Sequence, residues 1–203
     1  MQLSENGAMA LKAVAKAPKA TIFQIRITLL GTKPEVWRRI EVNGKTTLVK
    51  LHHIIQRAMG WDDYHLHEFR IRGQRYGAPE RKALGLPESP LHDESGLRLE
   101  ELGGDAVRFS YIYDFGDTWE HEVQIEGVVP PEPGVRYPRC RAGERACPPE
   151  DCGGIWGYAE LLAALRDPKH PRHKGYREWV GKEFEAERFD LEAVNHSLLR
   201  LRG

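Results

Sequence analysis

The chain has 203 residues, of which 40% are apolar and 30% are charged, a composition typical of a folded domain with its own core. Its 30 basic residues balance its 30 acidic residues, so the net charge does not favour nucleic acid and any such binding needs a local patch. The longest apolar runs are far below the roughly 18 residues of a membrane span. Three closely spaced cysteines indicate reduced thiols or a metal site. We therefore expect a cytoplasmic protein without a membrane segment.

The N-terminal half begins with a segment without periodicity and changes to an alternating apolar pattern near residue 21. Residues 1–20 carry alanines and spaced lysines but no aromatic side chain, which predicts a disordered tail. From Phe23 to Leu29 every second residue is apolar, as in a half-buried strand. Residues 31–34 turn the chain, and residues 36–42 form a second strand that pairs with the first as a hairpin.

A helix and three more strands follow the hairpin. Thr46 or Thr47 can cap a helix that runs to about Met59, because apolar residues recur there at helical spacing, and Gly60 ends it. Strands are expected at 66–72, 107–113 and 119–129. Residues 21–129 therefore predict an α+β core, a mixed β-sheet with one packed helix in the manner of a β-grasp. Its core is expected to contain Phe23, Ile25, Leu51, Ile55, Phe69, Phe109, Tyr111, Val123 and Ile125.

The C-terminal third has a different composition. Residues 130–157 contain prolines, glycines and all three cysteines without periodicity, which predicts an ordered loop. Residues 158–203 are expected to form helices packed on the core, at 158–165, at 171–180 and after Asp190. Asp190 is a good N-cap, and Phe189 and Val194 stand at the positions of a hydrophobic staple.

Histidines and carboxylates gather at the ends of two predicted strands. Strand alternation places His65 and His67 on the face of Phe69, and His121 on the face of Trp119. The three imidazoles are therefore expected to meet at one end of the core face, ringed by the turn residues Asp62, Asp63, Asp114 and Asp117. Such a cluster suits a metal site or acid–base chemistry, with Glu120 or an aspartate activating water. Alternatively, the histidines close the sheet edge by hydrogen bonds to the turn carboxylates.

The tripeptide Asp114-Phe115-Gly116 matches the metal-binding signature of protein kinases. The glycine-rich loop, strand lysine and His-Arg-Asp loop of a kinase are missing from the sequence. The tripeptide lies between two strong strand patterns, where a glycine supplies positive φ and aspartates bond the turn backbone. We interpret it as a hairpin turn.

Cys140, Cys147 and Cys152 form a second candidate site, with the spacing C-x6-C-x4-C. Three thiols leave a tetrahedral zinc ion one ligand short, so a structural zinc would need a histidine or water. Alternatively, Cys147 and Cys152 form a disulfide under oxidation, or all three are buried small residues.

Five blocks of sequence carry a resemblance to a known family. They are WRRIEV, AMGWDDYHLHEFRI, YDFGDTWEHEVQIE, PGVRYPRCRAGERACPPEDCGGIWGYAELLAAL and FDLEAVNHSLL. In this order, over about residues 21–200, they resemble the Ri-plasmid ORF-three-like family, also called the TnpR-like passenger protein of an insertion element. The resemblance implies an α+β domain found on plasmids, mobile elements and bacterial chromosomes.

Recombinase activity is not expected, because Ser4 lacks the arginine and helix-turn-helix of a serine resolvase and no tyrosine-recombinase set is present. Two functions remain as hypotheses. The first is a non-enzymatic binding or adaptor module for a protein or nucleic-acid partner. The second is a metal-dependent, hydrolase-like enzyme with His65, His67 and His121 as ligands.

Overall fold

The fold is built on one curved sheet that runs through most of the chain. The computed structural model describes residues 21–78 and 91–201. They form an eight-stranded sheet in the order β5-β4-β3-β6-β7-β1-β2-β8. Neighbouring strands are antiparallel except β4 and β5, which are parallel. The strands are β1 (Ile22–Leu29), β2 (Val36–Asn43), β3 (His67–Ile71), β4 (Gln74–Gly77), β5 (Leu91–Asp93), β6 (Arg108–Tyr113), β7 (Trp119–Val129) and β8 (Arg139–Glu144).

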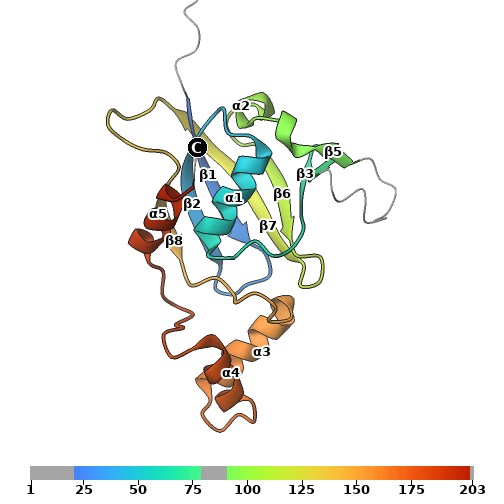
Figure 1. Ribbon diagram of the computed structural model, residues 1–203, viewed down its shortest axis with the longest axis vertical. Coiled ribbons are helices and arrows are strands. Elements are labelled where there is room, and N and C mark those ends of the chain that lie inside the picture. The colour runs from blue at the N-terminus through green and yellow to red at the C-terminus, as the bar shows by residue number, and fades with distance from the viewer. Residues whose placement is uncertain (1–20, 79–90, 202–203) are drawn as a thin grey trace, which may run out of the picture.

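Helix α1 (Leu48–Met59) lies across one face of this sheet (Figure 1). Thr47 caps it by accepting a hydrogen bond from the Lys50 backbone N–H, and Gly60 ends it in the left-handed conformation with φ 98°. The nine residues predicted for the core are all buried and belong to one cluster between helix and sheet. The prediction of an α+β fold with one helix packed on a mixed sheet is therefore confirmed.

Three strands were not expected from the sequence. β4 and β5 extend one edge of the sheet, next to the short helices η2 (Glu94–Gly96) and α2 (Leu99–Leu102). β8 forms the other edge, inside the segment 130–157 that was expected to be a loop. Its sequence RCRAGE buries one side chain fully, that of Cys140, because an edge strand is held mainly by backbone pairing, here to β2. Such a strand has no apolar alternation to reveal it.

The C-terminal helices occupy two places. Helices α3 (Gly154–Arg166) and α4 (His173–Val180) pack on each other beyond one end of the sheet (Figure 1). Helix α5 (Leu191–Leu199) packs against α1 and β8. As predicted, the Asp190 side chain caps α5, by accepting from the Ala193 backbone N–H at 2.9 Å. The predicted tail, residues 1–20, lies outside the described residues.

Helix α5 is joined to the outer strand by one amide side chain. Asn195 accepts a hydrogen bond from the backbone N–H of Cys140 at 2.7 Å and donates one to the Cys140 carbonyl at 3.0 Å. Both polar groups that Cys140 presents on the outer side of β8 are therefore satisfied by a side chain and not by another strand.

Candidate functional site

Three segments that are distant in the sequence meet at the end of the sheet nearest α3. They are the α1–β3 loop, the β6–β7 turn and the segment that precedes α3. Glu150 joins the first two to the third, because its carboxylate accepts hydrogen bonds from the Asp62 backbone N–H and from the Tyr113 hydroxyl. Asp117 accepts from the Gly153 backbone N–H at 3.0 Å. Trp61 donates its indole N–H to the Pro148 carbonyl at 3.0 Å.

The glycines of the CGGIWG stretch allow this close approach. A Cβ placed on Gly154 would lie 2.4 Å from the Asp117 carbonyl oxygen, and one on Gly157 would lie 1.8 Å from the Cys152 carbonyl oxygen. Helix α3 therefore begins four residues earlier than expected, with its glycines used for packing against backbone. These contacts place Asp151 and Cys152 beside the β6–β7 turn.

The Asp114-Phe115-Gly116 tripeptide forms the turn between β6 and β7, as predicted. The expected role of Gly116 was wrong, however, because the positive φ angles of the turn belong to Asp114 (55°) and Thr118 (56°). One carboxylate oxygen of Asp114 accepts from the Gly116 backbone N–H at 2.8 Å, which holds the left-handed conformation of the aspartate. The other oxygen is directed toward His65.

His65 stands between two of these carboxylates. Its Nε2 atom is 3.2 Å from Oδ1 of Asp151 and 3.8 Å from Oδ2 of Asp114. Asp114 is almost buried and Asp151 is exposed, so the group spans the protein surface. The three ligating atoms lie within 4.8 Å of one another. An imidazole nitrogen and two carboxylates in this arrangement can hold a divalent metal ion.

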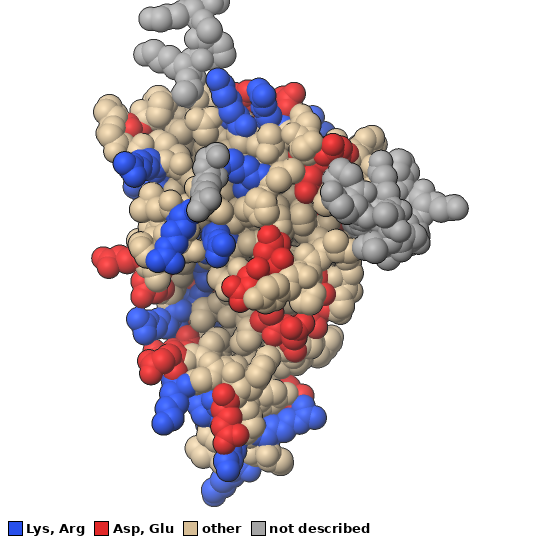
Figure 2. Space-filling view, viewed as in Figure 1, with Lys and Arg blue, Asp and Glu red and all other residues tan. Residues whose placement is uncertain are grey.

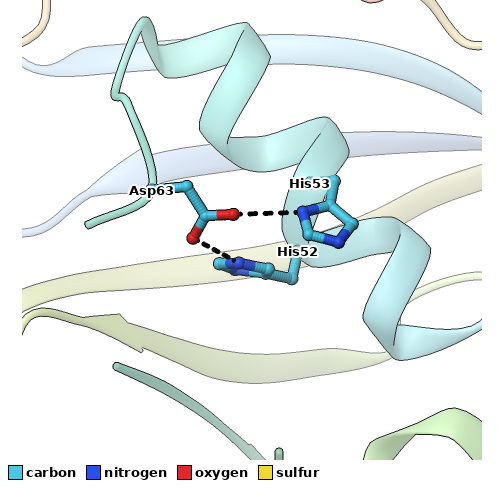
Figure 3. Close-up of side chains that lie close together, drawn as sticks. All are labelled: His52, His53 and Asp63. Atoms are coloured by element: carbon cyan, nitrogen blue, oxygen red, sulfur yellow. Dashed lines mark hydrogen bonds and ion pairs between the residues drawn. The ribbon is translucent and has the colours of Figure 1, made fainter. Parts of the chain in front are cut away.

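A second group, His52, His53 and Asp63, was not anticipated as a unit (Figure 3). One carboxylate oxygen of Asp63 lies 2.8 Å from Nε2 of His52, and the other lies 3.2 Å from Nδ1 of His53. Asp63 has φ 66°, which turns its side chain back onto α1. Burial acts to raise the pKa of Asp63, but the hydrogen bond from His52 and the neighbouring imidazoles outweigh it and lower that pKa. Asp63 is therefore a carboxylate that accepts from both rings.

The hydrogen bonds of His52 continue into the core. Nδ1 of His52 lies 2.8 Å from the Tyr111 hydroxyl, which also accepts from the Gln56 amide at 2.9 Å. Burial raises the pKa of Tyr111, so its hydroxyl keeps its proton and donates it to Nδ1. Burial also lowers the pKa of His52 to about 4, so a neutral ring donates from Nε2 to Asp63. The hydrogen bonds between Gln56, Tyr111, His52 and Asp63 thus all run in one direction, with each residue donating to the next.

The other two histidines of the predicted cluster lie in different environments. His67 stacks on His52 with ring centroids 3.5 Å apart, and its Nε2 is 2.7 Å from a carboxylate oxygen of Glu94. His121 is fully buried against Trp61 and Tyr111. In the described part of the chain, no three-atom ligand group contains more than one of His65, His67 and His121. The predicted meeting of the three imidazoles is therefore not observed.

The other three acidic residues of the predicted cluster belong to neither His/Asp group. Asp62 is exposed beside Glu150, and Asp117 is engaged with Gly153. Glu120 follows Trp119 on β7, so strand alternation places it on the face opposite His121. Its carbonyl accepts from the Leu30 backbone N–H at 2.9 Å. Asp62 and Asp117 thus border the place where the α1–β3 loop, the β6–β7 turn and the segment before α3 meet, which we call the junction. Glu120 does not border it.

The three cysteines are free thiols. Cys140 is buried in β8, while Cys147 and Cys152 are half-buried in the segment before α3. Burial raises the pKa of Cys147, and burial together with Asp117 raises that of Cys152 to about 12. Their sulfurs are not among the three-atom ligand groups found in residues 21–78 and 91–201. A zinc ion held by all three would therefore require this segment to rearrange.

Two cavities open between helix α4 and this junction. One, of about 480 Å³, is lined by residues of the α1–β3 loop and of the segment 146–151, including Asp62, Tyr64 and Glu150. The other, of about 620 Å³, is lined by Cys152, Arg172 and Tyr176. Asp151 and Trp179 line both. We call the two cavities together the α4 cleft.

Several residues of these groups were missed by the sequence analysis, for different reasons. His52 and Gln56 are four residues apart on the buried side of α1. Their helical spacing is the signal in the sequence that could have shown that both face the core. Glu94, Glu150 and Asp151 lie in segments without periodicity, and the sequence carried no signal for them.

Comparisons with known proteins identify relatives of the chain and the family to which it belongs. The described residues contain no helix that is long and apolar enough to cross a membrane. Uncharacterized protein y4hQ of Sinorhizobium fredii (strain NBRC 101917 / NGR234) is 38% identical over 180 residues, which cover 89% of each chain. The crystal structure of the protein of unknown function MM3350 from Methanosarcina mazei Go1 superposes with a TM-score of 0.76 at 36% identity, covering 86% of this chain and 98% of that one. A family model, plasmid pRiA4b ORF-3-like protein, matches residues 21–193, and the chain therefore belongs to this family.

Proposed function

We propose that this protein is a non-enzymatic binding module that holds a segment of a protein partner in the α4 cleft. The observation that carries the proposal is the pair of cavities that share Asp151 and Trp179. Their combined size and their mixture of apolar and polar walls suit a side-chain-bearing peptide segment. The cleft is formed by loops and helices at the end of a rigid sheet, a common position for a binding site.

Aromatic side chains stand at the mouth of the cleft. Trp179 is 48% exposed and Tyr64 is 76% exposed, which is unusual for such large rings. Tryptophan, tyrosine and arginine are the residues that most often dominate the binding energy of protein interfaces. Arg172 adds an arginine to this set of residues. It lines the larger cavity and donates a hydrogen bond to the Tyr176 hydroxyl at 3.0 Å.

The charges of the cleft favour a protein partner over a nucleic acid. Asp62, Glu150 and Asp151 line the smaller cavity, and such carboxylates repel a phosphate backbone. Over the face of the molecule in Figure 2, basic and acidic residues are interspersed and no field of one sign dominates. A protein segment with both apolar and charged side chains complements such a surface.

A site-specific photocrosslinker tests this proposal. It is placed at Trp179, and at Leu199 of α5 as a matched control, because Leu199 is a 58% exposed apolar residue on a helix that does not line the cleft. A partner captured from position 179 alone is then purified, and its affinity is measured for wild type, Trp179→Ala and Leu199→Ala. We expect at least about a tenfold loss for Trp179→Ala, as for a hot-spot residue, and no change for Leu199→Ala. Equal affinities, or capture of nucleic acid alone, would overturn the proposal.

A metal-dependent hydrolase is the second candidate function, favoured by the group His65, Asp114 and Asp151 at the cleft edge. In that case a bound ion would activate water for attack on a ligand in the cleft. Zinc at the cysteines, cytoplasmic location and the TnpR-like assignment stay predictions. Recombinase chemistry is no part of either candidate.

A further inference from the structure

We propose that His65, Asp114 and Asp151 bind a divalent transition-metal ion at the edge of the α4 cleft. This inference goes beyond the binding module, because it does not depend on the nature of the partner. The residues come from three segments: the α1–β3 loop, the β6–β7 turn and the stretch before α3. The site exists because the fold brings these segments together.

The distances fit one ion among the three side chains. Nitrogen and oxygen ligands bind zinc at about 2.0–2.2 Å, so two ligands at a tetrahedral angle stand roughly 3.3–3.6 Å apart. Nε2 of His65 is 3.2 Å from Oδ1 of Asp151 and 3.8 Å from Oδ2 of Asp114. The two carboxylate oxygens lie within 4.8 Å of each other, and a movement of the exposed Asp151 side chain toward Asp114 would bring all three atoms into range of one ion.

The Nε2 atom of His65 faces the two carboxylates without making a hydrogen bond in the described structure. Nε2 is excluded from solvent and makes no hydrogen bond, although a carboxylate oxygen of Asp151 is only 3.2 Å away. An N–H donor at that distance would be expected to aim at the oxygen. A cation that accepts the lone pair of Nε2, together with one oxygen from each carboxylate, would give this nitrogen a partner.

Asp114 is held in position for such a role. Its Oδ1 atom accepts from the Gly116 backbone N–H, which leaves Oδ2 directed at His65. Hydrogen bonds of this kind orient metal-binding carboxylates and strengthen the site. Asp114 is also nearly buried, so it provides a fixed ligand while exposed Asp151 provides an adjustable one.

The group His52, His53 and Asp63 is the internal comparison. There both carboxylate oxygens are already bonded to ring nitrogens, and the second nitrogen of His52 is bonded to Tyr111. The atoms that face one another in this group are hydrogen-bonded without an ion. The same residue types therefore form a hydrogen-bonded cluster at one place and an incomplete ligand set at the other.

The donor set indicates the class of metal. One imidazole and two carboxylates suit zinc, manganese or iron(II) better than calcium, which prefers oxygen ligands alone. Three protein ligands leave at least one coordination position open. Asp151 lines both cavities, so that position borders the cleft and is available to water or to an oxygen of a bound molecule.

Titration of the full chain with Co²⁺ and Zn²⁺ after chelation and dialysis tests the site. We expect one ion per chain by calorimetry, a visible Co²⁺ absorption band, and a raised Tm. In His65→Asn and Asp151→Asn the affinity falls at least tenfold and the Co²⁺ band is lost. Asp151 is exposed and His65 is partly exposed, and circular dichroism and Tm of the metal-free variants verify that they fold.

His53→Asn and Cys152→Ser are the controls, since they alter the other His/Asp group and the nearest thiol. Both should retain one ion per chain with unchanged affinity. The proposal is overturned if the wild type binds no ion, if both site variants bind as the wild type does, or if the band is lost in Cys152→Ser and kept in Asp151→Asn. The affinity of a captured protein partner is a separate measurement, so failure of the metal site leaves the binding module testable.

Discussion

The imidazole rings of His52 and His67 stack face to face, with centroids 3.5 Å apart and planes 6° from parallel. His52 is bonded to Tyr111 and Asp63 in the direction expected for a neutral ring, and His67 is bonded to Glu94. Two stacked rings at this distance do not readily carry two positive charges. The stack therefore makes the inner surface of α1 sensitive to acid.

The first prediction concerns this sensitivity. Burial lowers the pKa of both His52 and His121 to about 4 from an unfolded value of 6.5. The unfolded state therefore binds more protons between these values, so stability is fully present above pH 6.5 and is lost as pH falls toward 4. Each group contributes a slope of up to about 1.4 kcal/mol per pH unit in this window. Urea unfolding at pH 7.5, 5.5 and 4.5 measures it.

His52→Gln is the variant that isolates one of the two groups. Its free energy of unfolding should fall less steeply between pH 6.5 and 4 than that of wild type, because one titrating ring is gone. His53→Gln is the matched control on the exposed side of α1. Identical slopes in wild type and His52→Gln would show that His52 does not set the acid response.

The second prediction concerns the hydroxyl of Tyr111. Tyr111→Phe leaves the ring in place but removes the partner of both Gln56 and Nδ1 of His52. Unpaired buried polar groups cost about 1–3 kcal/mol, so we expect a loss of that size in chemical unfolding. Tyr137→Phe is the control, because its hydroxyl accepts from an exposed backbone N–H and its loss should cost less than about 0.5 kcal/mol. Equal effects would contradict the buried hydrogen bonds of Tyr111 with Gln56 and His52.

The third prediction tests the contact between α1 and the sheet. Ile55 is fully buried in the core cluster, and truncation of such a residue to alanine costs roughly 2–5 kcal/mol. Leu199→Ala, at an exposed helical position, should change stability by no more than about 0.5 kcal/mol. A loss below 1 kcal/mol for Ile55→Ala, on the scale of about 2–5 kcal/mol for buried residues, would mean that the helix is not held by the core.

The fourth prediction tests the glycine-dependent junction. In Gly157→Ala the new Cβ meets the Cys152 carbonyl at 1.8 Å, so backbone must move and the start of α3 is displaced. We expect a lower Tm and a changed fluorescence of the neighbouring Trp156. In Gly175→Ala the new Cβ meets nothing within 4 Å, and alanine is favoured over glycine in a helix by about 0.5–1 kcal/mol. A Tm for Gly157→Ala at or above that of Gly175→Ala would contradict the close packing.

The elements that were predicted correctly are those whose own side chains create a buried face. β1, β7 and α1 place apolar residues at spacings of two or of three to four, and these spacings are visible in one sequence. β8 was missed because its pairing partner, and not its own pattern, makes it a strand. Edge strands of this kind are defined by tertiary structure.

The candidate site, like the fold, was predictable only where the local sequence pattern determines the position of a residue. His65 and Asp114 were placed near each other because both stand at strand ends that lie at one end of the sheet. Asp151 could not be added, since its position depends on the packing of Gly154 against Asp117, a contact between residues 37 positions apart (154 minus 117). The separation of His67 and His121 follows from the unpredicted partners Glu94 and Trp61.

The pairing of Asn195 with Cys140 covers part of an outer edge of the sheet. A sheet edge with free N–H and C=O groups is a template for another strand, and it favours association of identical chains into fibrils. Here the amide of Asn195 occupies both backbone groups of Cys140 near the start of β8, and α5 lies against that strand. Helix α5 thus covers part of this edge and disfavours the pairing of another strand there. Loss of this helix should expose the outer strand β8 and favour aggregation through it.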